Sequence, residues 1–254
     1  MILLFDIGNT HTHVGWARGG GVGRQFSVPT RGWVRRGNRK LVREWVGSIM
    51  PKGVAICSVV PGVTPEVVAF VRRQWGVVAV ELNAGTVEGV GVDYPRPETI
   101  GPDRLANAIA VRHHYGCPAV AVDFGTAVTV DVVNSAGDYV GGVIAPGLAA
   151  MTDYLHEKTA LLPRIRIREV STSIGRSTEE AMLIGAVHGY RGLISEVIGE
   201  VKRELGVRRL PVVATGGYAG LIARGLRQIQ AVDPTLTLEG LRLFWELKAG
   251  VGVG

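Results

Sequence analysis

Short apolar runs alternate with amphipathic segments along this chain, which is the pattern of an α/β protein. Runs rich in Val, Ile and Ala are long enough for strands and too short for buried helices. The sequence predicts strands over residues 2–5, 54–59, 77–82, 119–122, 129–133 and 212–214.

Start and stop signals mark four helices between these strands. Thr64 is placed to cap the first helix, with Pro65 at its first position and Gly76 after its end. Ser177 and Glu180 form a capping box ahead of a long helical run to residue 205. Spacings of three and four predict two more helices, over residues 103–114 and from residue 237 onward.

One unit of sequence occurs twice. An apolar strand ends in Asp6-x-Gly8-Asn9, and about 117 residues later another ends in Asp123-x-Gly125-Thr126. A second β-type run follows each turn, so both units are predicted hairpins, whereas dinucleotide and P-loop sites place a helix after the glycine turn. Asp and Gly are common in ordinary hairpins, but the repetition predicts a duplicated domain with two phosphate-binding turns facing each other across a cleft.

A third glycine turn, Thr215-Gly216-Gly217, follows the strand at 212–214 and precedes a helical start. Such a turn can lie beneath the ribose and base of a nucleotide. A strand joined to a helix by two glycines is also a common structural connection, and the turn alone does not decide between the two.

Composition narrows the class of protein without fixing its chemistry. The 254 residues are 46% hydrophobic, and every apolar run is interrupted by a charged residue before it reaches membrane-spanning length. The N-terminal apolar run lacks the features of a signal peptide, so we expect a soluble, cytoplasmic protein. Cys57 and Cys117 lack metal-site spacing and are expected to be reduced, buried thiols.

The net charge of +6 suits an anionic partner, which could be nucleic acid, a membrane surface or a phosphorylated small molecule. The densest basic stretch has helical spacing, which favours one solvated helix face over an RNA-binding surface. Its basic residues are Arg31, Arg35, Arg36, Arg39, Lys40 and Arg43.

Five short motifs, in this order, resemble the signatures of the type III pantothenate kinases. They are DIGNT at 6–10, GPDR at 101–104, DFGTA at 123–127, GGVIAPG at 141–147 and TGG at 215–217. The resemblance implies the actin-like ATPase fold, an α/β architecture of two ribonuclease-H-like domains with the active site in the cleft between them, here at residues 1–115 and 116–254. It also implies a homodimer that phosphorylates pantothenate with ATP in the first step toward coenzyme A.

The resemblance assigns a role to residues that match these motifs. Asp123 would bind a monovalent cation, K⁺ or NH₄⁺, and Asp103 would be the general base. Pantothenate would contact Tyr94, Gly101, Pro102, Asp103, Arg104 and Thr178, with some contacts crossing the dimer interface. ATP with Mg²⁺ would contact Thr126 and the first loop, Asp6, Ile7, Gly8, Asn9, Thr10, His11, Thr12 and His13, with Asp6 on the metal side.

Asp103 also has a structural interpretation, because an acidic residue after Gly-Pro is a good helix N-cap. Both roles are compatible, and the positive end of the helix dipole predicts a lowered pKa for this carboxyl. Arg104 beside it can pair with the carboxylate of a substrate or form an ordinary surface ion pair. His11 and His13 have no third ligand in the sequence and receive no chemical role.

Two other functions fit the same residues. Phosphate turns do not select the acceptor, so a sugar kinase or a polyphosphate phosphatase on this scaffold is one alternative. A non-catalytic regulator that binds nucleic acid through the basic stretch is the other, and steep salt dependence without ATP turnover would identify it.

Overall fold

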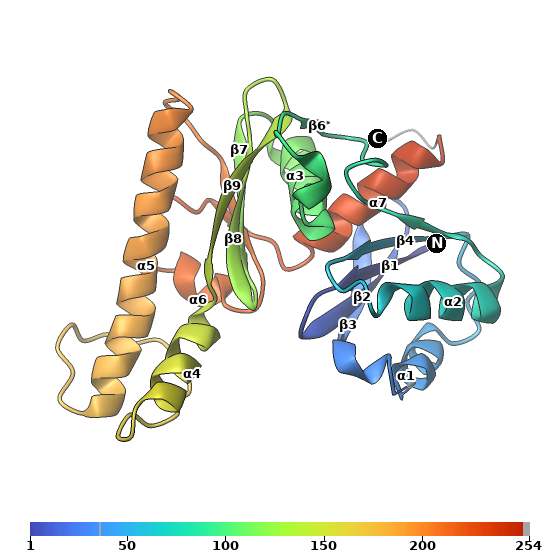
Figure 1. The fold of residues 1–254 in the computed structure, drawn as a ribbon. Coiled ribbons are helices and arrows are strands. Elements are labelled where there is room, and N and C mark those ends of the chain that lie inside the picture. The colour runs from blue at the N-terminus through green and yellow to red at the C-terminus, as the bar shows by residue number, and fades with distance from the viewer. Residues whose placement is uncertain (36, 251–254) are drawn as a thin grey trace. The chain divides into compact units, whose positions relative to one another are not determined.

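A computed structural model describes residues 1–35 and 37–250 of the chain (Figure 1). Arg36, part of the basic stretch, lies outside the described residues. The chain divides into two compact units, one made of residues 1–116, 137–140 and the segment from Thr235 onward, the other of residues 117–136 and 141–234. Each unit is described by itself, and the domain ranges 1–115 and 116–254 stay a prediction.

The first unit is built on a five-stranded sheet of order β3-β2-β1-β4-β5. Strand β1 pairs antiparallel with β2 and parallel with β4. The strands are β1 (Ile2–Ile7), β2 (His11–Ala17), β3 (Val22–Pro29), β4 (Gly53–Ser58) and β5 (Ala79–Glu81). Helices α1 (Gly37–Val46), α2 (Thr64–Trp75), α3 (Pro102–Tyr115) and α7 (Leu236–Lys248) complete the unit, with two 3-10 turns at Thr30–Gly32 and Pro97–Thr99.

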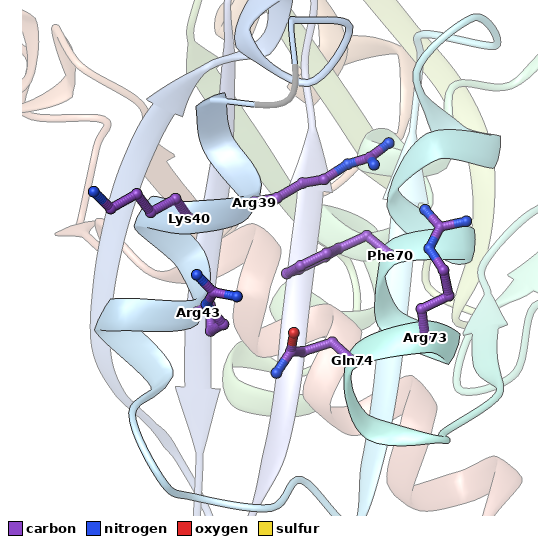
Figure 2. Close-up of a pocket in the computed structure, with 6 residues that line it drawn as sticks. All are labelled: Arg39, Lys40, Arg43, Phe70, Arg73 and Gln74. Atoms are coloured by element: carbon purple, nitrogen blue, oxygen red, sulfur yellow. The ribbon is translucent and has the colours of Figure 1, made fainter.

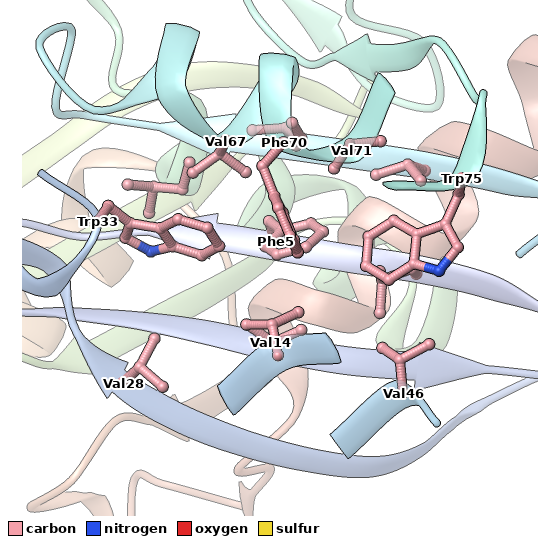
Figure 3. Close-up of a cluster of buried hydrophobic side chains, with 14 of the residues drawn as sticks. Phe5, Val14, Val28, Trp33, Val46, Val67, Phe70, Val71 and Trp75 are labelled. Carbon is pink, nitrogen blue, oxygen red and sulfur yellow. The ribbon is translucent and has the colours of Figure 1, made fainter. Parts of the chain in front are cut away.

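The two faces of this sheet pack against different helices. Leu3, Phe5 and Ile7 enter a buried cluster with residues of α1 and α2, among them Phe70 (Figure 3). Trp33, which follows the 3-10 turn at Thr30–Gly32, belongs to the same cluster. Because side chains alternate along a strand, Asp6 projects from the other face. On that face α7 approaches so closely that a Cβ at Gly53 would overlap Trp245.

Helices α3 and α7 cross closely within the first unit. A Cβ at Gly240 would overlap the backbone of Ala106, so glycine permits this contact. Thr237 donates a hydrogen bond to Oδ1 of the buried Asn107 at 2.8 Å. The C-terminal helix therefore holds α3 in place, and α3 carries Asp103 at its start.

The second unit repeats the arrangement of the first. Strand β7 (Ala119–Phe124) pairs antiparallel with β8 (Ala127–Val133) and parallel with β10 (Val212–Thr215). The strand order of this unit is β11-β10-β7-β8-β9, where β9 is Asp138–Pro146 and β11 is Ala231–Val232. Strand β6 (Gly91–Val92) belongs to the first unit, where it pairs parallel with Asp138 and Tyr139 at the start of β9. Strands β8, β7, β10 and β11 have the same relative directions as β2, β1, β4 and β5, as the duplicated motifs predict.

Helices α4 (Leu148–Lys158), α5 (Thr178–Glu204) and α6 (Ala219–Ala223) belong to this second unit. Glu180 N–H donates to Oγ of Ser177 at 3.2 Å, which confirms Ser177 as the cap of α5. The carboxylate of Glu180 accepts from the N–H of Arg176 instead of returning to Ser177, so the box is closed one residue earlier than predicted.

Two local predictions are wrong. Helix α2 begins with Thr64 already inside it, and the hydroxyl of Thr64 donates to Ser58 and Val60 rather than capping the helix. Cys117 is exposed, because it follows Gly116 in the turn after α3, whereas Cys57 is buried in β4 as expected. None of the described helices is long and apolar enough to cross a membrane.

Candidate functional site

The first predicted phosphate turn is a tight bend held by backbone hydrogen bonds. Gly8 N–H donates to the carbonyl of His11 at 3.0 Å. Thr30 fastens the bend from outside, because its Oγ1 donates to Gly8 O at 2.6 Å and its N–H donates to Thr10 O at 2.9 Å. The turn is therefore fixed in shape before any ligand arrives.

The side chains of this turn divide into exposed and buried groups. Asn9, Thr10, His11 and His13 are exposed, and they are the groups that an incoming ligand can reach. Ile7 and Thr12 are fully buried. Trp33 Nε1 donates to the Thr12 hydroxyl at 3.1 Å, so in this structure Thr12 supports the turn from behind.

The two histidines have different surroundings. Nδ1 of His13 lies 2.7 Å from the hydroxyl of Ser27 on the neighbouring strand. Partial burial, and then the nearby His11, lower the pKa of His13 below its ordinary value. Within the described chain no three His, Cys, Asp or Glu side chains gather into a metal-binding group.

Asp6 lies beside a buried thiol. It pairs in register with Cys57 of the parallel strand β4, and the Cys57 thiol donates to Oδ1 of Asp6 at 3.4 Å. Burial, then the charges of Asp6 and Asp103, raise the pKa of Cys57 well above its ordinary value. The thiol is therefore protonated at neutral pH, donates to Asp6, and is also within the electrostatic influence of Asp103.

Asp103 occupies the second position of α3, and Gly101 is the N-cap. Oδ1 of Asp103 accepts from the N–H of Arg104 at 2.9 Å. Burial raises the pKa of Asp103, and the hydrogen bond and charge of Arg104 offset only part of that effect. The predicted lowering of this pKa is therefore wrong, because loss of water around the carboxyl outweighs the helix N-terminus.

The other predicted acceptor contacts of the first unit gather around Tyr139, a buried residue that the sequence analysis missed. The guanidinium carbon of Arg104 lies 5.6 Å from the centre of the Tyr139 ring. The Tyr94 ring lies 6.1 Å from the same ring. Tyr139 thus contacts both side chains, and Arg104 directly follows Asp103 on α3. Its only sequence signal was its place just before the GGVIAPG motif.

In the second unit the DFGTA turn rests on the end of the GGVIAPG motif. Gly147 N–H donates to Thr126 O at 3.1 Å, and a Cβ at Gly147 would overlap the carbonyl oxygens of Gly125 and Thr126. Tyr190 of α5 donates to Pro146 O at 2.6 Å and fixes the motif from the helix side. Thr126 remains exposed. Two motifs that are separate in sequence therefore form one loop pair.

Asp123 meets the TGG turn in the same unit. Gly216 has φ +89°, and a Cβ there would lie 2.5 Å from Oδ1 of Asp123 and 2.7 Å from the backbone nitrogen of Phe124. Only glycine fits this conformation and this approach. The strand, glycine turn and helix predicted around Gly216 are confirmed by β10 and α6.

Thr178, the remaining predicted acceptor contact, is exposed at the first position of α5. It borders a groove of about 390 Å³ between α4 and α5 that is mainly apolar, with Met151, Leu155, Leu162 and Met182 among its lining residues. Thr178 belongs to the second unit, whereas Tyr94, Asp103 and Arg104 belong to the first.

Comparison with solved structures defines the class of fold. A Baf family transcriptional activator from Campylobacter jejuni matches 98% of this chain and 99% of its own with a TM-score of 0.65 and 18% identity. The inorganic polyphosphate/ATP-glucomannokinase from Arthrobacter sp. strain KM matches 98% of both chains with a TM-score of 0.50 and 14% identity. The fold is the α/β actin-like ATPase fold shared with sugar kinases, which confirms the predicted fold class.

Sequence comparison then gives the family. The family model for type III pantothenate kinase matches residues 2–200. A type III pantothenate kinase from Akkermansia muciniphila is 49% identical over 220 residues, which are 86% of this chain and 87% of the relative. One from Methylacidiphilum infernorum is 40% identical over 247 residues, covering 97% and 88%. The chain therefore belongs to the type III pantothenate kinase family, and the predicted resemblance is confirmed.

Proposed function

We propose that this protein transfers the γ-phosphoryl group of ATP to the primary hydroxyl of pantothenate and so forms 4′-phosphopantothenate, the first step of coenzyme A biosynthesis. Family membership supports the kinase activity and the acceptor. The observation that carries the site is the position of Asp103, a partly buried carboxyl of raised pKa whose charge acts on Cys57 together with that of Asp6 from the first phosphate turn.

On the nucleotide side, the two turns hold the phosphates of ATP. The first offers the exposed Asn9 and Thr10 on a bend fixed by Thr30, and the second offers the exposed Thr126. Hydroxyl, amide and backbone N–H groups of this kind are suitable donors to phosphate oxygens. Because the turns are already rigid, little ordering cost opposes ATP binding.

Two partly buried carboxylates suit the cations of the reaction. Asp6 would face the Mg²⁺ that accompanies ATP and neutralises phosphate charge, and Asp123 would hold K⁺ or NH₄⁺. Both are oxygen ligands of the type that hard cations prefer, and each lies at the end of a central strand. The close approach of Asp123 to Gly216 would place the monovalent cation beside the third glycine turn.

On the acceptor side, Arg104 pairs with the pantothenate carboxylate and Tyr94 borders the chain of the substrate. Asp103 accepts the hydroxyl proton as the oxygen attacks in line. A raised pKa makes the carboxylate of Asp103 a stronger base than that of an ordinary aspartate. Since phosphoryl transfer has a loose transition state, positioning contributes more than this proton transfer.

A homodimer in the cytoplasm is the assembly that we propose. Thr178 contacts pantothenate at an interface between copies, next to an apolar groove that a second chain could cover. We place the homodimer in the cytoplasm because the reaction consumes ATP, which is available there. We propose no association with a membrane.

A coupled assay of ADP release tests acceptor and cation together. Pantothenate, a hexose and acetate are compared as acceptors, each in K⁺, NH₄⁺ and Na⁺. We expect turnover with pantothenate in K⁺ or NH₄⁺ and at least about tenfold less with the other acceptors. Equal or faster turnover with a hexose would make the protein a sugar kinase on the same scaffold. Equal rates in K⁺ and Na⁺ would contradict the proposed role of Asp123 in binding K⁺ or NH₄⁺.

A further inference from the structure

A second concave surface of the first unit lies between α1 and α2, with a volume of about 310 Å³ (Figure 2). Three lining residues come from α1 and three from α2. They are Arg39, Lys40, Arg43, Phe70, Arg73 and Gln74. Four of the six are cationic and none is acidic, so the concavity has the electrostatic character of an anion site.

The charges of this basic pocket are only partly neutralised by the protein. Arg39 pairs with Glu66, and Lys40 lies 3.8 Å from Glu44. Arg43 and Arg73 have no carboxylate partner in the described part of the chain. Both are exposed, and the exposure of Arg43 agrees with the solvated helix face predicted for the basic stretch. Two arginines therefore remain free to bind an anion, and arginine favours phosphate oxygens.

Arg39 carries a further sign of an incomplete site. Its Nε is buried and has no hydrogen-bond acceptor among the described residues. A buried donor without an acceptor is unfavourable, because it has lost its hydrogen bonds to water and gained none from the protein. An oxyanion in the pocket would supply that acceptor after a small rotation of the Arg39 side chain, whose exposed fraction is 19%.

The basic pocket is separate from the candidate catalytic residues. Its floor, Phe70, belongs to the cluster that packs on Phe5 and Ile7 at one face of the first sheet. Asp6 projects from the opposite face, where its carboxylate meets Cys57. A ligand between α1 and α2 would therefore occupy a site distinct from the Asp6 turn.

We propose that this basic pocket binds a compact polyphosphate anion, such as inorganic tripolyphosphate or the diphosphate group of a nucleotide. Four cations around one concavity suit several negative charges held close together. Nucleic acid would need cations spread along a longer track, whereas these converge on about 310 Å³. Gln74 adds an amide that can hydrogen-bond a phosphate or a neighbouring hydroxyl.

Calorimetric titration with inorganic tripolyphosphate tests this proposal. We compare the wild type with the double variant Arg43→Gln/Arg73→Gln and with the control Arg208→Gln/Arg209→Gln, which removes the same charge from two exposed arginines of the second unit. We expect the pocket variant to lose one binding site per chain, or to bind that site at least about tenfold more weakly. The control should bind as the wild type does.

Parallel titrations with ADP and with a short duplex DNA identify the source of the anion. If the pocket variant binds ADP more weakly than the wild type does, the site is assigned to nucleotides. If only the binding of tripolyphosphate is weakened, the site is assigned to inorganic polyphosphate. The proposal is overturned if tripolyphosphate does not bind the wild type, or if it binds the wild type, the pocket variant and the control with the same number of sites and the same affinity. It is also overturned if DNA binds through the same arginines more tightly than tripolyphosphate does. Thermal unfolding shows whether the double variant is folded. If it is not, the single variants Arg43→Gln and Arg73→Gln are titrated in its place.

Discussion

The thiol of Cys57 donates a hydrogen bond to Oδ1 of Asp6, with 3.4 Å between sulfur and oxygen. The contact joins two parallel strands at their carboxyl ends, where Asp6 and Cys57 are partners in register. No local motif links the two residues, because they are 51 positions apart in the chain. The thiol therefore fixes the position of one oxygen of the Asp6 carboxylate.

This contact predicts unequal reactivity of the two cysteines. Cys57 is fully buried and its pKa is raised, so almost no thiolate is available, whereas Cys117 is exposed. We expect Ellman's reagent to modify one thiol per native chain and both thiols after unfolding in guanidinium chloride. The variant Cys117→Ser should then show no fast reaction in the native state. Rapid modification of Cys57 in that variant would contradict the buried thiol.

Replacing Asp103 by Asn tests the base. We expect turnover to fall by about 10² to 10⁴, with apparent affinity for Mg-ATP nearly unchanged, because the amide keeps the shape of the side chain and loses proton acceptance. Steady-state kinetics with each substrate varied separates the two effects. Wild-type turnover in Asp103→Asn would remove the role of base from this residue.

The pH profile gives a second measure of Asp103. Because burial raises its pKa, the carboxylate is protonated at a higher pH than an ordinary aspartate. The acidic limb of kcat/KM should therefore lie above the ordinary aspartate range, with activity lost as pH falls through it, and Asp103→Asn should lack this limb. A wild-type limb within the ordinary range would show that the carboxyl is not desolvated as described.

Replacing Asp6 by Asn tests the nucleotide side separately. The substitution removes the charge that we place next to Mg²⁺, so the apparent affinity for Mg-ATP should fall by at least about tenfold. Titration of Mg-ATP at saturating pantothenate measures this change. If both the affinity and the turnover match those of the wild type, Asp6 does not face the metal.

The period of the hydrophobic pattern and the duplicated Asp-x-Gly turns were sufficient to predict an α/β protein with a duplicated domain, whereas the actin-like ATPase fold was predicted from the resemblance to type III pantothenate kinases. Buried strands such as β1 and β7 have continuous apolar runs, and the turn after each contains the residue types that a tight bend requires. Strand β3 escaped prediction because Arg24 and Gln25 interrupt its apolar pattern at an exposed edge. Its hydrophobicity alone could not separate it from a loop.

The surroundings of the site residues were harder to predict than their identities. The pKa of Asp103 depends on burial by neighbours distant in sequence, whereas the sequence shows only its place near a helix start. Tyr139 likewise acquires its position beside Tyr94 and Arg104 through tertiary packing. Local motifs reveal candidate groups, and the fold decides which of them share an environment.

The TGG turn permits a paired test of two adjacent glycines. Gly216→Ala places a side chain at φ +89° against the backbone of Phe124, which should reduce the free energy of unfolding by about 1 to 2 kcal/mol or more. Gly217→Ala is the control, because a Cβ there meets no atom within 4 Å among the described residues. Urea unfolding measures both. Equal effects of the two substitutions would contradict the close approach of Gly216 to β7.

A buried ion pair on α7 makes stability depend on pH. The side chains of Arg242 and Glu239 are 3% and 7% exposed, and His114 lies 3.0 Å from Glu239. Burial raises the pKa of Glu239, but the hydrogen bonds and charges of Arg242 and His114 outweigh it and leave a net lowering. Glu239 therefore stabilises the fold above its unfolded-state pKa, and this contribution is lost as pH falls through the lower folded-state pKa.

Glu239→Gln should reduce the free energy of unfolding by about 3 kcal/mol at neutral pH, since it leaves the buried Arg242 with Glu246 as its remaining carboxylate partner. Glu200→Gln is the matched control, because Glu200 pairs with Arg203 at the same helical spacing on an exposed face and should cost under about 1 kcal/mol. Urea unfolding across the acidic range measures both, and the difference between wild type and Glu239→Gln should shrink as pH falls. A difference that stays constant with pH would show that packing, and not the charge of Glu239, stabilises the contact between α3 and α7.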